Sequence, residues 1–223
     1  MPISRDTLDF LAENRMRNDK AWFRENKERY ETLVKQPMRE IAEKLVPVIE
    51  EIDPLMVTRP QSAVSRIYRD TRYSRDKTIF RDVMWVSFQR DKKVYDCPAG
   101  FVLEFSPNGF RYGCGYYKTP RPTMQAIREL VLKNDKSFRE AEKAYRNQHT
   151  FQLEGECYKR AHYPEHPKQE WLEKRTINFL HNSEDFELLY SKDLPLMLSR
   201  DFLILKPMYR FLMRAEELAR LED

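Results

Sequence analysis

The hydrophobic periodicity changes near residue 54, and this change constrains the fold more than any other feature of the sequence. Over residues 1–53, apolar side chains recur at steps of three and four residues, as they do on one face of a helix. Residues 83–117 instead hold short β-branched and aromatic runs separated by Pro, Asn and Gly, a pattern typical of strands and turns. Helical spacing returns towards the end of the chain. The sequence therefore predicts helices at both ends of a strand-rich centre.

We expect a single α+β domain over residues 1–223, with an antiparallel or mixed central sheet and helices from the N- and C-terminal parts packed on it. In this scheme residues 1–53 are helical, residues 54–160 are mainly strands with two helices, and residues 161–223 are mainly helical. An antiparallel meander is predicted from the runs at 83–89, 101–106 and 110–117.

Three prolines bear on the helix boundaries. Pro37 suits the first turn of a helix, where its missing N–H costs little. Pro47 should kink or split that helix, because an interior proline costs about 3 kcal/mol. Pro207 fits an early position of the last helix.

Composition and charge disfavour several classes of function. The 40 basic and 36 acidic residues leave a net charge of +4, which is small for a dedicated nucleic-acid-binding protein. No apolar run approaches the roughly 18 residues that cross a bilayer, and the first residues do not read as a signal peptide, so we expect a cytoplasmic protein without membrane association. The three cysteines suggest neither a disulfide framework nor a zinc site. We assign no cofactor and no metal ligand.

Residues 66–81, which read RIYRDTRYSRDKTIFR, are the strongest candidate site. They hold six cations against two aspartates. A strand followed by a loop is expected, because the Ile, Tyr, Thr and Ser residues disfavour a helix. On a strand, Arg66, Tyr68 and Arg72 lie on one face and Arg69 on the other. The candidate ligand-binding residues are Arg66, Tyr68, Arg69, Asp70, Arg72, Ser74, Asp76 and Lys77.

Two interpretations of this segment stay open. In one, Asp70 and Asp76 pair with the arginines in an ion-pair network that only fixes the ends of the strand. In the other, Arg69, Asp70, Arg72 and Lys77 floor a polar pocket for a small anionic ligand, bearing phosphate or carboxylate, or for an acidic partner.

An enzyme is the first alternative. A hydrolase or transferase acting on a phosphorylated substrate could use the same cations to stabilise developing negative charge. The arginines, however, hold Asp70 and Asp76 ionised, which disfavours either as a general base. No catalytic residue is assigned.

A nucleic-acid-binding or protein-interaction module is the second alternative. Acidic residues are mixed throughout the chain, so nucleic acid is the less favoured partner, and the oligomeric state is left open. A charged face with aromatic stacking surfaces would be formed by Arg66, Tyr68, Arg69, Arg72, Tyr73, Arg111, Tyr112, Tyr116 and Lys118.

Several short motifs occur in a characteristic order along most of the chain. The most specific is the string from Arg69 to Ser74 followed by Asp76, Lys77 and Thr78. A second motif is Gly113-Cys114-Gly115-Tyr116, whose glycines predict a bulge or close packing. The remaining residues of the pattern are Asn18, Trp22, Phe23, Lys27, Tyr30, Gly155, Lys159 and Arg160. With these residues the chain resembles the family called domain of unknown function 2461. The resemblance implies a single α+β domain and supplies no activity and no catalytic residue.

Overall fold

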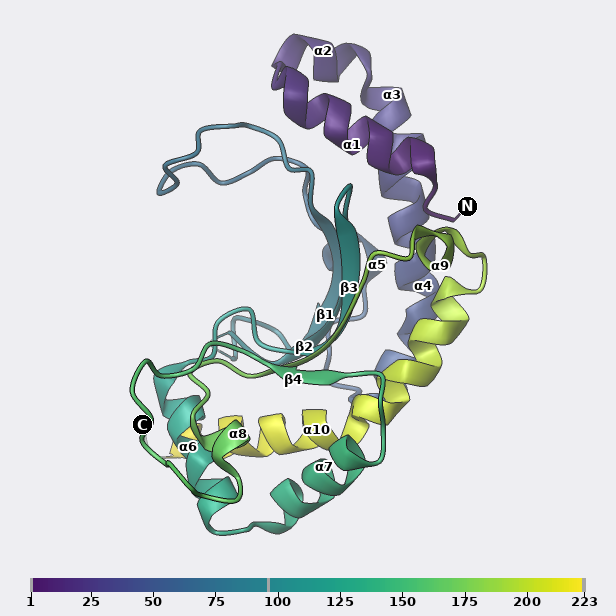
Figure 1. Ribbon diagram of the computed structural model, residues 1–223. Coiled ribbons are helices and arrows are strands. Elements are labelled where there is room, and N and C mark those ends of the chain that lie inside the picture. The colour runs from purple at the N-terminus through teal and green to yellow at the C-terminus, as the bar shows by residue number, and fades with distance from the viewer. Residues whose placement is uncertain (1, 96, 222–223) are drawn as a thin grey trace. The chain divides into compact units, whose positions relative to one another are not determined.

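The computed structural model describes residues 2–95 and 97–221 (Figure 1). Within these residues, helices accompany one five-stranded antiparallel sheet with the strand order β1-β2-β3-β5-β4. The α+β class is therefore confirmed. The strands are β1 (Met84–Gln89), β2 (Gly100–Ser106), β3 (Gly109–Gly115), β4 (Gln152–Glu154) and β5 (Asn178–Ser183).

The predicted meander corresponds to β1, β2 and β3, whose ends differ from the predicted ones by at most two residues. Side chains along β1 and β2 alternate between buried and partly exposed, as a sheet with one core-facing side requires. β4 pairs with β5 in antiparallel register, with Leu153 opposite Phe179.

Helical elements lie before, between and after the strands within the described residues. Asp19 caps α2, because its carboxylate accepts hydrogen bonds from the backbone N–H groups of Ala21 and Trp22. The helical elements are α1 (Arg5–Arg17), α2 (Lys20–Glu25), α3 (Lys27–Tyr30), the π-helix η1 (Glu31–Lys35), α4 (Gln36–Ile52), α5 (Pro60–Ala63), α6 (Arg121–Leu132), α7 (Lys136–Arg146), α8 (Gln169–Leu172), α9 (Phe186–Tyr190) and α10 (Leu194–Leu221).

The three prolines give mixed outcomes. Pro37 lies in the first turn of α4, as predicted. Pro47 lies inside α4, so the predicted split of this helix does not occur. Pro207 lies well inside α10 rather than near its start, so that prediction is wrong. Burial explains the difference. The apolar face of α4 is buried along its length, and each buried Leu or Ile contributes about 1.5–3 kcal/mol, which outweighs the cost of one proline.

The chain divides into two compact units. The first comprises Met1–Phe88, Val102–Tyr112 and Asn182–Ser199, and the second comprises Gln89–Phe101, Gly113–His181 and Arg200–Asp223. The core of the second unit centres on Trp171, whose fully buried ring lies 5.2 Å from that of Phe138. None of the helices in the described part of the chain is both long and apolar enough to cross a membrane.

Candidate functional site

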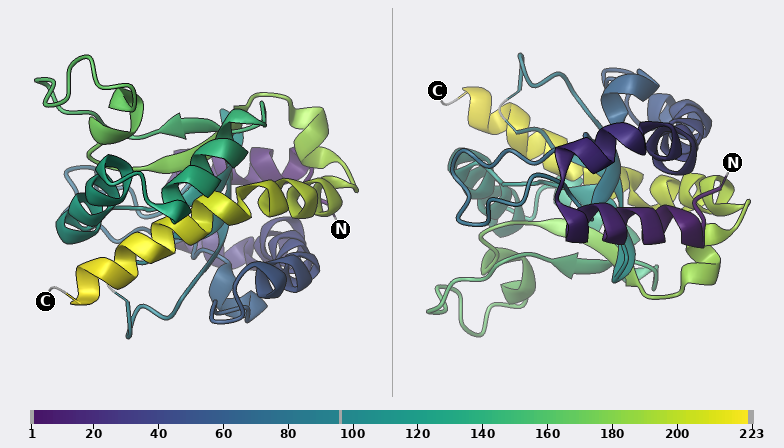
Figure 2. Two further views of the ribbon diagram at one scale, coloured as in Figure 1. Left: turned by 90° about the horizontal axis from the view of Figure 1, so that it is seen from below. Right: turned by 90° about the horizontal axis from the view of Figure 1, so that it is seen from above.

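Residues 66–81 belong to the first unit and form an extended loop whose two runs lie side by side (Figures 1 and 2). Backbone hydrogen bonds join the runs, from Arg69 N to Ile79 O (2.8 Å) and from Arg81 N to Ile67 O (2.9 Å). The structure assigns only an isolated bridge, between Tyr68 and Phe80, so the predicted strand is wrong. The reason is local, because aspartate side chains compete for the backbone N–H groups beyond the bridge: Asp70 accepts from Arg72 N, and Asp76 from Thr78 N.

An aromatic cluster holds the base of this loop against the N-terminal helices. The ring of Phe23, in α2, lies 5.6 Å from that of Tyr68 and 4.9 Å from that of Phe80. Phe80 is fully buried, and Ile67 is nearly so. Asn18, which ends α1, adds a polar tie, because its side-chain oxygen accepts a hydrogen bond from Ile79 N at 2.6 Å.

The centre of the loop is organised around the carboxylate of Asp76. Arg15, from the last turn of α1, donates to Asp76 Oδ2 at 2.7 Å, and Arg69 donates to the same oxygen. Thr78 donates to Oδ1 through its hydroxyl (2.7 Å) and its backbone N–H (2.9 Å). These four residues are called the Asp76 cluster below. The two bonds from Thr78, followed by those from the arginines, hold the pKa of Asp76 well below its ordinary value.

Asp70 forms a separate and more exposed pair with Arg72. The guanidinium donates through Nη2 to Asp70 Oδ2 at 2.7 Å and through Nε to Oδ1 at 3.0 Å. This side-chain pairing lowers the pKa of Asp70 to about 2. The Arg72 guanidinium also lies 5.9 Å from the centre of the exposed Tyr73 ring.

The predicted site residues are thus distributed over several contacts. Arg69 and Asp76 meet in the Asp76 cluster, and Ser74 accepts a long hydrogen bond from Arg69 Nη2 (3.4 Å). Lys77 donates to the carbonyl oxygen of Thr71 at 2.9 Å. Tyr68 packs at the base of the loop, and Arg66 is exposed. Of the four residues expected to floor one pocket, Asp70 and Arg72 therefore pair with each other, whereas Arg69 and Lys77 contact other partners.

Arg15 is the residue that sequence reasoning missed. It lies 61 positions before Asp76, and no local pattern links the two. One signal was present, because Arg15 and Asn18 are three residues apart and so share a face at the end of α1, where both contact the loop.

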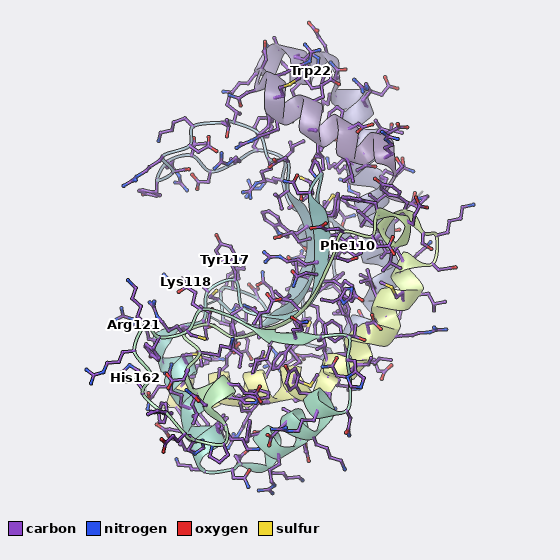
Figure 3. All side chains as sticks on the ribbon, viewed as in Figure 1. Trp22, Phe110, Tyr117, Lys118, Arg121 and His162 are labelled. Atoms are coloured by element: carbon purple, nitrogen blue, oxygen red, sulfur yellow. The ribbon has the colours of Figure 1, made fainter. Side chains whose placement is uncertain are left out.

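The wider aromatic and cationic face expected for nucleic acid is not assembled as predicted. Tyr112 and Tyr116 are buried, so their rings are not available for stacking on bases. Arg111 pairs with Glu104 at 2.8 Å, whereas Lys118, labelled in Figure 3, is exposed.

Charge is concentrated in the loop. Residues 66–81 hold six cations and two aspartates, an excess of +4 that equals the net charge of the whole chain. Within the described residues, no acidic side chain forms an ion pair with Arg66, Arg75 or Lys77, and all three are exposed. Two cavities, of about 740 and 670 Å³, are lined by other residues.

Fold and site together define an α+β protein with a cationic loop that an arginine-rich cluster ties to the first helix. A family model described as "conserved hypothetical protein (DUF2461)" matches residues 6–211, and the chain belongs to this family. The resemblance seen in the sequence is thereby confirmed. A search of curated proteins finds no match.

Proposed function

We propose that the chain binds an anionic ligand, bearing phosphate or carboxylate groups, through the cationic loop of residues 66–81. The observation that carries this proposal is the charge distribution. The remainder of the chain is neutral in sum, while this exposed segment holds the entire excess of +4. Guanidinium groups match carboxylate and phosphate geometry, so Arg66 and Arg75, with Lys77, offer the complementary charge.

The Asp76 cluster supports binding by holding the loop in place. Its hydrogen bonds, with that of Asn18, join the loop to α1. A segment that is already ordered loses less conformational entropy when a ligand binds. The ion-pair and binding interpretations are therefore compatible, because paired cations position the loop while unpaired cations face the ligand.

The enzyme alternative receives less support. A general base works best when its pKa lies near the working pH. The pKa of Asp70 falls to about 2, and that of Asp76 is lowered as well, so both carboxylates are weak bases. Binding without turnover is the function that this geometry favours.

Isothermal titration calorimetry with pyrophosphate and with citrate tests the proposal. The double variant Arg66→Ala/Arg75→Ala should bind at least about tenfold more weakly, because each lost charge-assisted contact is worth about 1.5–3 kcal/mol. The variant Arg5→Ala/Lys44→Ala loses the same charge from α1 and α4 of the same unit and should bind like the wild type.

Salt provides an independent check. Contacts between exposed charges weaken as ionic strength rises, so affinity should fall between 50 and 300 mM salt in the wild type. The proposal fails if neither probe produces heat, or if the two double variants lose affinity equally.

A further inference from the structure

A second cationic site lies in the second unit, at a cavity of about 670 Å³ bordered by α7 and the segment that precedes α8. Its charged lining consists of four cations and one carboxylate, with a histidine beside them. These residues are Arg139, Lys143, Arg146, Lys168, Glu142 and His166. The volume falls in the range of cavities that hold small molecules.

Glu142 organises two of these cations. Its Oε1 accepts hydrogen bonds from Arg146, through Nε at 3.1 Å and Nη2 at 2.9 Å, and also from Lys168 Nζ. Glu142 is only 9% exposed, so its carboxylate is buried in the wall of the cavity. Burial raises the pKa of Glu142, but the bonds from Lys168 and Arg146 lower it by more, and the group stays ionised.

The cations keep donors that Glu142 does not use. The Arg146 side chain is 58% exposed and that of Lys168 is 27% exposed. Arg146 keeps three further N–H groups and Lys168 two further protons, and Lys143 is exposed on the preceding turn of α7. Glu170, outside the lining, lies 3.9 Å from Arg146 Nη2. Two carboxylates do not neutralise four cations, so the cavity carries an excess of positive charge.

His166 adds a donor of fixed orientation. Its Nδ1 accepts a hydrogen bond from Lys168 N at 3.1 Å. An accepting Nδ1 carries no proton, so the ring proton lies on Nε2. The turn that leads into α8 therefore fixes the tautomer.

Apolar residues form the other part of the wall. Leu132 and Pro167 line the cavity, and both are exposed despite their apolar character. Apolar walls beside a few convergent polar groups are typical of small-molecule sites. The other cavity, lined by Glu104, Glu184 and Arg111, lacks this excess of cations.

We propose that this cavity binds a small organic phosphate or carboxylate. Its anionic group pairs with Lys143, Arg146 and Lys168, and its apolar part lies against Leu132 and Pro167. The site is independent of the cationic loop, because no residue is shared between them.

Calorimetry on the full chain tests this site with phenyl phosphate and with benzoate, and with phenol as the neutral counterpart. At least one of the two anions should bind, and at least about tenfold more tightly than phenol. The tighter of the two assigns the anionic group. Inorganic phosphate should bind more weakly than phenyl phosphate, because it cannot use the apolar wall.

Lys143→Ala is the decisive variant, because this exposed lysine lines the cavity and its removal leaves the Glu142 contacts intact. It should weaken binding of the anion about tenfold. Lys133→Ala is the matched control, since this lysine is 72% exposed, pairs with Glu129 at 3.3 Å and does not line the cavity. The loop variant Arg66→Ala/Arg75→Ala should bind both aromatic anions normally.

Three results would overturn the proposal. The first is that neither aromatic anion binds more tightly than phenol. The second is that Lys143→Ala and Lys133→Ala weaken binding equally, which would indicate diffuse attraction to a positive surface. The third is that the loop variant alone loses binding, which would place the anion in the first site and refute the cavity proposal separately.

Discussion

The substitution Gly113→Ala tests how closely β3 approaches its neighbour. Gly113 has a φ of +155°, and a Cβ at this position would lie 2.0 Å from the carbonyl oxygen of Phe179. Ordinary contacts begin at 3.4 Å, so one backbone would have to move by about 1.4 Å, the difference between these distances. The neighbouring atoms belong to the backbone of β5 and cannot rotate away as a side chain can.

The expected cost has two parts. The unfavourable φ costs about 1–3 kcal/mol for a residue with a side chain. The displaced backbone costs about 1–3 kcal/mol more. We expect Gly113→Ala to lower the free energy of unfolding by about 4 kcal/mol. For a chain of this length, Tm should then fall by about 8–16 °C.

Gly109→Ala separates the two parts. Gly109 has a similar φ of +144°, but its nearest neighbour, the carbonyl oxygen of Ser183, lies 3.0 Å from a Cβ placed there. This variant should therefore show mainly the cost of the backbone conformation, about 2 kcal/mol. Thermal unfolding followed by circular dichroism measures both. If the two variants melt within about 2 °C of each other, the steric argument at Gly113 is wrong.

Acid should destabilise the wild type more than Asp76→Asn. The pKa of Asp76 in the folded state lies below its ordinary 3.8, so the stability that this carboxylate contributes is present above about pH 4 and is lost as the pH falls. Thermal melts at pH 5 and 2.5 measure this difference. Arg128→Met should cost about 3 kcal/mol in urea unfolding, because the carbonyl oxygens of Leu172 and Lys174 lose a buried charged donor. Trp171→Ala should cost about 3–5 kcal/mol in the same assay, since its ring is fully buried. Lys133→Ala, within about 0.5 kcal/mol of wild type, is the control for both. An equal loss of stability in acid for Asp76→Asn and the wild type would contradict the first prediction. A change in the free energy of unfolding below about 1 kcal/mol would contradict the prediction for Arg128→Met or for Trp171→Ala.

The strand pattern was predictable because it is local. β1, β2 and β3 follow from short β-branched and aromatic runs separated by Pro, Asn and Gly, and the ends of each strand lie within two residues of the predicted ends. For the glycines of β3 the sequence left a bulge or close packing open, and the structure shows a close approach between Gly113 and the backbone of Phe179. Neither inference required knowledge of residues far away in the sequence.

The helix interiors were less predictable. Pro47 and Pro207 disfavour a helix by their own conformational preferences, yet α4 and α10 continue through them. Burial of an apolar face depends on what packs against it, and a single sequence does not contain that information.

The candidate site shows the same division. The sequence by itself determined that residues 66–81 carry the excess charge and that Asp70 and Asp76 have arginines within reach. Only the tertiary structure decided which arginines pair with which aspartate, because Arg15 reaches Asp76 from a helix 61 residues earlier. Charge is a sum over residues, whereas an ion pair needs two side chains at one place. The fold alone brings them together.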